Sequence, residues 1–181
     1  MKTKLLGKRF LIISIVCISV LLISSVILNK VYVTPYIVPA ESKYEPSALD
    51  RKITEDGYAY YILKDDSNNS YYATITQYNG DDSKAAIPAT IENISVKVIS
   101  RSSFFEKNNV SEIIVPNTIE VIEPCAFEKC KSLSSVTLYN DKVIIDSEAF
   151  DKGADIIIIA HKGSTGEKFA NDHKLTFKEL S

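Results

Sequence analysis

The sequence predicts a β-rich repeat solenoid carried by one membrane-spanning helix, and two patterns predict it. An uncharged apolar run near the N-terminus is long enough to cross a bilayer. A 23-residue period of aromatic and aliphatic residues then recurs three times, which indicates stacked structural units. We therefore expect four parts, which are a cytoplasmic tail at 1–9, a membrane segment at 10–28, a linker at 29–56 and a repeat domain with caps at 57–181.

The membrane segment runs from Phe10 to Leu28 and contains 19 residues without charge, Pro or Gly. As a helix it spans about 28 Å, close to the thickness of the hydrocarbon core. Four basic residues precede it and only Lys30 follows closely, so the positive-inside rule places the tail in the cytoplasm and the domain outside. We favour an uncleaved anchor. A cleaved signal peptide is the alternative, although its best cleavage site, Val38-Pro39-Ala40, lies a dozen residues beyond the run.

The linker is recognised by its composition. It contains three of the six Pro residues and no sustained periodic pattern. Pro favours extended backbone, so this segment is expected to lift the domain off the membrane.

Charge is unevenly divided along the chain. Residues 1–40 contain five Lys or Arg and no acidic residue, which leaves 16 basic and 23 acidic residues in 41–181, a net charge of −7. An acidic domain argues against a nucleic-acid partner, because phosphate binding needs a basic face. Three Cys exclude a disulfide-rich miniprotein, and two His leave little material for a His-based metal site.

The repeat is anchored on Phe104, Phe127 and Phe150, which are spaced by 23 residues. Aliphatic residues recur at fixed offsets, at Ile99, Ile122 and Ile145 five residues before each Phe and at Val110, Leu133 and Ile156 six residues after it. A single unit of this kind cannot bury its apolar edges, whereas about three stacked units bury a continuous core. We therefore expect about three rungs, with the Phe side chains inside.

The second copy shows which kind of repeat this is. Leu133, Val136 and Leu138 have the L-x-x-V-x-L spacing of a leucine-rich repeat strand, and a period of 23 lies within the range of that class. The predicted fold is therefore a leucine-rich repeat solenoid with a short parallel sheet along one side.

The stretch VIEPCAFEKCKSLSSVTL (121–138) resembles the BspA-like leucine-rich repeat family, whose pattern is I-x-x-x-A-F-x-x-C-x-x-L-x-x-I-x-[IL]-P. The resemblance covers about 57–180 and implies an exported cell-surface protein that acts in adhesion or protein interaction, with host matrix proteins among the candidate partners. The third copy departs from the pattern, with Gly153 at the Cys position and no Pro after its strand. The first copy has Ser103 where Ala is usual. The terminal rungs are therefore expected to be irregular.

Both ends of the stack need caps. Two segments rich in aromatic and β-branched residues, 58–63 and 71–76, flank a polar turn and predict an N-terminal β-hairpin. At the other end, Ser164 followed by Glu167 is a capping box that predicts a helix over 164–171. A short strand is expected at 175–177.

No catalytic motif stands out, so we expect neither an enzyme nor a cofactor. His161 and His173 have no Cys or carboxylate at metal-ligand spacing and are interpreted as surface residues. Cys130 is expected to be a buried free thiol and Cys125 a surface one, with a disulfide between them as the alternative.

Two surfaces are candidates for binding. The first is the strand face, where we expect the outward positions Ser111, Glu112 and Ile114, then Ser134, Ser135 and Thr137, then Ile157, Ile158 and Ala160. Ser111, Glu112, Ser135 and Thr137 are the leading contact residues. The second is the hairpin, whose tyrosines favour ordinary cross-strand packing, with an exposed tyrosine strip of Tyr58, Tyr60 and Tyr72 as the alternative.

These patterns predict a membrane-anchored extracytoplasmic protein that binds another protein or surface macromolecule without catalysis. An alternative keeps the fold and makes the domain a scaffold or regulatory module for an envelope protein of its own cell. A secreted hydrolase is the weakest hypothesis, because the repeat supplies no cluster of acid, base and nucleophile.

Overall fold

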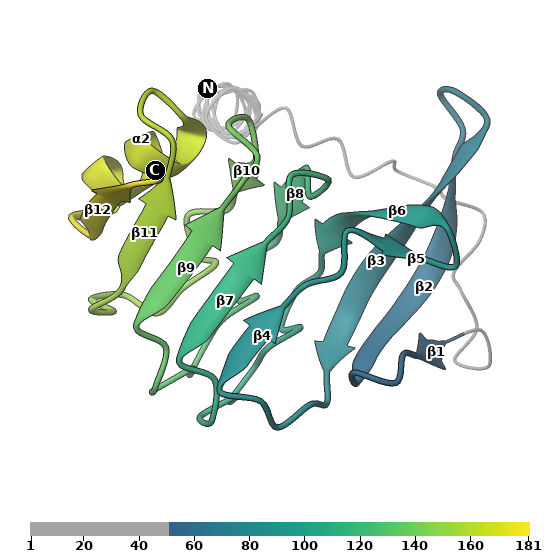
Figure 1. Ribbon diagram of the computed structural model, residues 1–181, viewed down its shortest axis with the longest axis horizontal. Helices are drawn as coiled ribbons and strands as arrows, with labels where there is room; N and C mark the ends of the chain where they lie inside the picture. The colour runs from purple at the N-terminus through teal and green to yellow at the C-terminus, as the bar shows by residue number, and fades with distance from the viewer. Residues whose placement is uncertain (1–50) are drawn as a thin grey trace, which may run out of the picture. The chain divides into compact units, whose positions relative to one another are not determined.

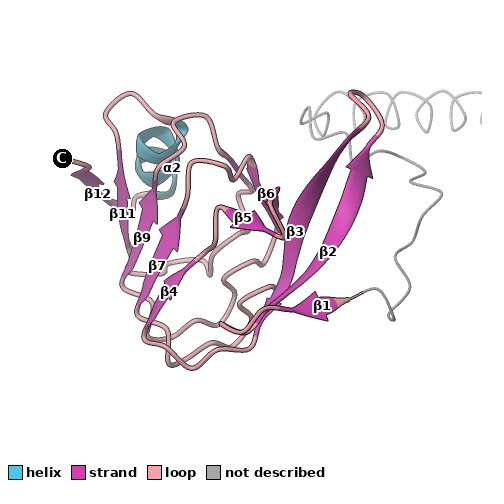
Figure 2. Cartoon of the chain, turned by 45° about the vertical axis from the view of Figure 1, so that its right-hand side comes forward, coloured by secondary structure: helices cyan, strands magenta, loops and turns pink. Residues whose placement is uncertain are grey.

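A computed structural model describes residues 51–181 as a β-solenoid with a hairpin at one end and a helix at the other (Figures 1 and 2). The expected tail, membrane segment and most of the linker lie outside the described residues. Within 51–181, no helix has the length and apolarity needed to span a bilayer.

Two sheets run along the stack. Sheet A has the strand order β1-β2-β3-β6-β8-β10, with β5 paired to β6. Its strands are β1 (Lys52–Ile53), β2 (Tyr58–Asp65), β3 (Ser70–Tyr78), β5 (Thr90–Ile91), β6 (Ile94–Ile99), β8 (Val121–Ile122) and β10 (Ile144–Ile145).

Sheet B has the order β12-β11-β9-β7-β4, and every neighbouring pair is parallel (Figure 1). Its strands are β4 (Lys84–Ala86), β7 (Glu112–Val115), β9 (Ser135–Leu138), β11 (Ile157–Ala160) and β12 (Thr176–Glu179). These five strands correspond to about five turns of solenoid, so the expectation of about three rungs is too low.

Residues at equivalent positions of successive repeats lie side by side in neighbouring strands. Ile113 lies beside Val136, and Val136 lies beside Ile158, so aliphatic side chains stack from rung to rung inside sheet B. Ile99, Ile122 and Ile145 are aligned in the same way in sheet A. Each rung therefore buries its apolar edges against equivalent positions of the next rung, as the repeat predicts.

An aromatic column runs through the interior. Tyr78, Phe104, Phe127, Phe150 and Phe169 follow one another with ring centroids 4.9–5.8 Å apart. These separations lie in the range of favourable ring pairs. The three predicted Phe residues are thus inside, and the two caps extend the column with one ring each.

Hydrogen bonds tie the rungs together where the chain enters sheet B. The Ser111 hydroxyl donates to the Ser83 carbonyl at 3.0 Å, and the Ser134 hydroxyl donates to the Ser111 carbonyl at 2.9 Å. No buried side-chain nitrogen or oxygen of the described part of the chain lacks a hydrogen-bond partner.

Both predicted caps are present. The hairpin of β2 and β3 is longer than expected, and its inner end packs on the first rung. Helix α2 (Thr165–His173) begins after Ser164, whose hydroxyl accepts from the Glu167 amide at 3.3 Å. A Cβ on Gly166 would lie 2.8 Å from the Cβ of Ala160, so this glycine permits the close approach of α2 to β11.

The two described cysteines are free, so the alternative of a disulfide between them is wrong. Cys130 is buried and its thiol donates to the Phe104 carbonyl at 2.9 Å. Burial raises the pKa of Cys130 to about 11, which leaves an unreactive thiol with a packing role.

Candidate functional site

The outer face of sheet B is the candidate recognition surface. Because side chains alternate along a strand, every second residue points away from the core. Register between neighbouring strands then aligns these residues into two rows that cross the sheet. The first row is Lys84, Glu112, Ser135, Ile157 and Thr176, and the second is Ala86, Ile114, Thr137, Ile159 and Lys178.

The strand register corrects one sequence-based expectation. Ile158 and Ala160 were expected to face outward, but they are 0% and 1% exposed and belong to the core. Ile157 points outward as expected and is 37% exposed, and Ile159 points outward in place of Ile158 and Ala160. The cause is the pairing of Ile158 with inward-facing Val136, which fixes the alternation of β11.

Three of the leading contact residues lie together on this surface. Glu112 and Ser135 are neighbours in the first row, and Thr137 lies in the second row between Ile114 and Ile159. Ser111 precedes β7, and its hydroxyl is already used in the bond to Ser83. The structure therefore gives Ser111 a role in joining rungs.

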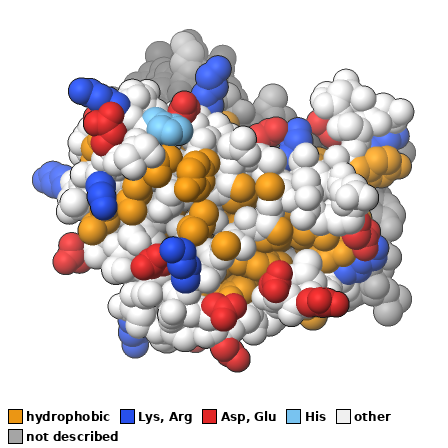
Figure 3. All heavy atoms as spheres, viewed as in Figure 1, with side chains coloured by type: hydrophobic (Ala, Val, Ile, Leu, Met, Phe, Trp, Pro, Cys, Tyr) orange, Lys and Arg blue, Asp and Glu red, His pale blue; other side chains and the backbone are white. Residues whose placement is uncertain are grey.

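Apolar side chains dominate the middle of the surface. Figure 3 shows hydrophobic groups forming a band across this side of the molecule, with charged groups around it. Ile114 on β7 and Ile157 and Ile159 on β11 contribute to the surface from the two sides of β9, whose Ser135 and Thr137 hydroxyls lie between them. Tyr139 follows Thr137 by two residues, so it is expected on the same face of the sheet, and it is 46% exposed.

Two polar contacts between side chains lie near the edges of the surface. The Lys84 ammonium lies 3.1 Å from a carboxylate oxygen of Glu112. His161 Nδ1 lies 2.7 Å from a carboxylate oxygen of Asp141. Exposed ion pairs contribute little to stability, but the pair of Lys84 and Glu112 balances two opposite charges at one edge of the surface.

The hairpin tyrosines do not form an exposed strip. Tyr58 and Tyr60 are 2% and 4% exposed, so the candidate contact role of these two residues is wrong and the favoured packing interpretation is confirmed. Tyr60 instead donates from its hydroxyl to Glu92 at 3.0 Å, and Glu92 also binds Lys52 of β1. Strand β1, which lies within the predicted linker range, pairs with β2 opposite Tyr60 and helps to cover it.

Tyr72 is half-buried on β3 of sheet A. Its pKa is raised, first by burial and then by the nearby carboxylates of Asp65 and Glu123. Since Ser135 and Thr137 belong to sheet B, the structure does not bring Tyr72 together with them.

Sequence reasoning missed several residues of the surface. Lys84 and Lys178 were overlooked because β4 and β12 depart from the repeat pattern that revealed β7 and β9. Ile159 was hidden in a run of four isoleucines, where no polar residue marks the alternation. Tyr139 could have been found by continuing the two-residue period past Thr137.

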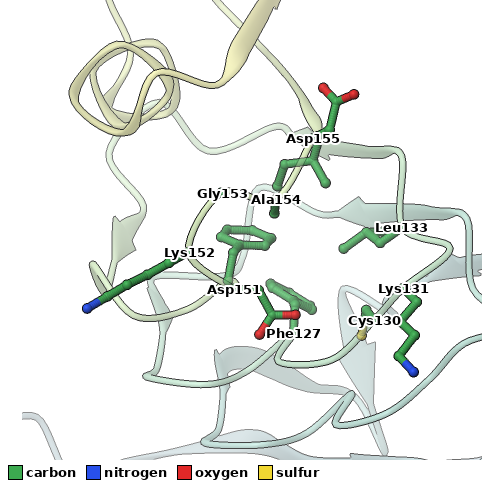
Figure 4. A pocket seen from close by; sticks show the side chains of 11 residues that line it. Phe127, Cys130, Lys131, Leu133, Asp151, Lys152, Gly153, Ala154 and Asp155 are labelled. Carbon is green, nitrogen blue, oxygen red and sulfur yellow. The ribbon is translucent and has the colours of Figure 1, made fainter.

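One hollow of about 250 Å³ lies beside the third repeat (Figure 4). Its apolar lining includes Phe127, Leu133, Phe150 and Ile156. It opens next to Gly153, where a Cβ would meet no atom within 4 Å. Since Gly153 stands where the repeat pattern has Cys, the hollow marks a missing packing side chain. Lys152 points away from it in Figure 4.

Within residues 51–181, no three His, Cys, Asp or Glu side chains lie close enough together to hold a metal ion. The two histidines are used elsewhere, His161 with Asp141 and His173 in a stack on Phe169 with centroids 4.0 Å apart. The chemistry that the described surface offers is therefore contact through apolar groups and hydroxyls.

Comparison with known proteins gives a family match. The model for the BspA type leucine rich repeat region, in six copies, matches residues 83–172. This range begins just before β4 and ends within α2, so it contains the strands β4, β7, β9 and β11 of the candidate surface but not β12. No curated protein matches the sequence significantly.

Solved bacterial structures with leucine-rich repeats are also similar. A leucine-rich repeat protein from Bacteroides capillosus is 26% identical, with a TM-score of 0.40, over 61% of this chain and 72% of that one. A leucine rich cell surface protein from Faecalibacterium prausnitzii is 20% identical, with a TM-score of 0.43, over 76% of this chain and 33% of that one. A Bacteroides ovatus leucine-rich repeat protein is 18% identical, with a TM-score of 0.42, over 71% and 41%.

Proposed function

Because this chain belongs to the family of BspA-type leucine-rich repeat proteins, we propose that it binds another macromolecule through the outer face of sheet B, outside the cytoplasm and without catalysis. One observation carries the proposal. Ile114, Ile157 and Ile159 form an apolar surface on a regular sheet whose strands are fixed by the core beneath them. Solvent-facing apolar patches with a polar rim are typical of interaction sites.

The mechanism is passive recognition on a preformed surface. The inward side chains of the same strands, such as Val136 and Ile158, are completely buried, which holds the outward ones in place. When a partner binds, this protein therefore loses little conformational entropy, and such preorganisation favours affinity.

Membrane attachment is the second part of the proposal. The uncharged run at 10–28 and the basic residues before it support a single-pass anchor with the solenoid outside the cell. In this arrangement the protein acts in surface adhesion, with host matrix proteins as the first candidate partners.

An affinity capture tests the proposal. The purified full-length protein is offered to host matrix proteins and to an envelope extract of the producing cell. Ser135→Arg plus Thr137→Arg places two large cations in the middle of the surface and should abolish saturable capture. The matched control, Ser132→Arg plus Ser147→Arg, adds the same charge at two exposed turn positions and should leave it unchanged. Equal capture by both double variants would contradict the proposal.

A second candidate function is a scaffold or regulator that binds an envelope protein of the same cell. The predicted linker favours it, since 28 residues span at most about 100 Å when fully extended. A partner found only in the producer's own envelope, and lost with the same double variant, would establish this function and exclude adhesion to a host.

A further inference from the structure

We propose that the occupant of the sheet B face is an extended peptide segment of about seven residues, with a carboxylate at the end that lies over β12. This inference rests on the proposed function and identifies the class of partner. The carboxylate belongs to an Asp or Glu side chain or to a chain terminus.

The dimensions of the surface favour a slender occupant. Five strands about 4.8 Å apart span about 19 Å, and four residues of strand add about 13 Å in the other direction. The area is therefore on the order of 300 Å², whereas a stable protein–protein interface needs about 800 Å² per partner. A folded partner or a second copy of this chain would need much more contact than this face offers, but an extended chain of about seven residues matches its length at about 3.3 Å per residue.

The second row supplies the chemistry along that length. From β4 to β11 it offers Ala86, Ile114, Thr137 and Ile159, three apolar side chains and one hydroxyl. Small and β-branched side chains of a peptide would pack against the apolar members, and the Thr137 hydroxyl can bond a peptide amide or carbonyl. No charged residue interrupts this part of the row.

The row ends at Lys178, which lies beside Ile159 in the register of β11 and β12. Lys178 is exposed, and its side chain forms no ion pair with other residues of 51–181. Lys84, the other lysine of the two rows, differs in this respect, since it is paired with Glu112. Lys178 is thus the unpaired cation of this surface, and the complementary ligand group is a carboxylate.

The test selects ligands without assuming their sequence. The full-length protein is used to pan a phage-displayed library of random heptapeptides, and enriched peptides are resynthesised for fluorescence anisotropy. We expect alternating aliphatic residues with an Asp or Glu toward one end. Lys178→Glu should weaken binding by about tenfold or more, and replacing the peptide's acidic residue with Lys should restore it.

A matched control and a second test variant accompany this charge reversal. Lys152→Glu makes the same change at an exposed lysine of the loop beside Gly153 and should leave affinity unchanged. Ile157→Asp, at an already exposed position, should abolish binding while the circular dichroism spectrum is retained.

The inference is overturned if no peptide is enriched, if enriched peptides bind Ile157→Asp as well as the original protein, or if Lys178→Glu has no effect. These failures are distinguishable from failure of the proposed function. A macromolecular partner that is still lost with Ser135→Arg plus Thr137→Arg, while no heptapeptide binds, would leave the surface assigned and show that its partner binds as a folded protein.

Discussion

Phe127 occupies the middle of the aromatic column, with Phe104 at 5.4 Å on one side and Phe150 at 4.9 Å on the other. It is 2% exposed, and its rung contributes Ile122 to sheet A and Val136 to sheet B. The residue that revealed the repeat in the sequence is therefore also a packing contact between three successive rungs.

Phe127→Ala should lower the free energy of unfolding by about 3–5 kcal/mol, because it removes a buried ring and leaves a cavity. The rungs on either side keep this cavity from closing. Phe105→Ala is the control, since its ring is 38% exposed and lies under the Lys129 ammonium at 4.7 Å. That substitution should cost about 1 kcal/mol or less. Urea unfolding followed by circular dichroism measures both, and similar losses for the two variants would show that the column does not hold the rungs together.

Single residues also show where sequence reasoning reaches its limit. Phe104, Phe127 and Phe150 were placed inside correctly because a 23-residue period is directly visible in the chain. For Tyr60 the choice between packing and exposure stayed open, because β1, which pairs beside it, and Glu92, which accepts its hydroxyl, come from segments without a repeat pattern. Burial by a segment distant in sequence leaves no local signal.

At the scale of elements, α2 was predictable from its first turn alone. The Ser164 hydroxyl accepts from the Glu167 amide, and the Glu167 carboxylate accepts from the Gly163 amide at 2.6 Å. Both hydrogen bonds at the helix start are therefore made by residues close together in the sequence. The same helix seals the end of the stack through Phe169 and Ala170, which are buried. By contrast, the facing of β11 depends on its register with β9, and no pattern inside its own sequence determines it.

Ser164→Ala should reduce the free energy of unfolding by about 1 kcal/mol, since the Glu167 amide at the helix start loses its acceptor. Ser147→Ala, at an exposed serine after β10, should change it by less than about 0.5 kcal/mol. Thermal unfolding of the two variants, compared at the same protein concentration, checks the difference. A destabilisation by Ser147→Ala as large as that by Ser164→Ala would show that α2 does not depend on its cap.

At the scale of the whole molecule, the sequence predicted the solenoid and its caps but not the number of turns. A search for a fixed period finds only the repeats that have identical spacing in the sequence, whereas a turn of the solenoid can stack whenever its aromatic ring contacts the ring of the next turn. Tyr78 precedes Phe104 by 26 residues and Phe169 follows Phe150 by 19, yet both join the column. Loops of different length therefore hide the terminal turns from a search for a fixed period.

The candidate surface was predictable to a similar degree. Glu112, Ser135 and Thr137 were placed on it because β7 and β9 follow the repeat pattern. Lys178 was not, because it lies on a cap strand that joins sheet B only in the folded chain. The register of β11 adds Ile157 and Ile159 to this surface, and the edge strand β12 ends the second row with the Lys178 cation.

Site-specific photocross-linking tests most directly whether this surface is the recognition site. The photoreactive amino acid p-benzoylphenylalanine is introduced at Thr137, in the middle of sheet B, or at Ile144, which is 50% exposed on sheet A. Each full-length protein is irradiated with host matrix proteins and, separately, with the producer's envelope extract. We predict a discrete adduct from position 137 and none from position 144. An adduct from position 144 alone, or equal adducts from both, would contradict recognition by the sheet B face.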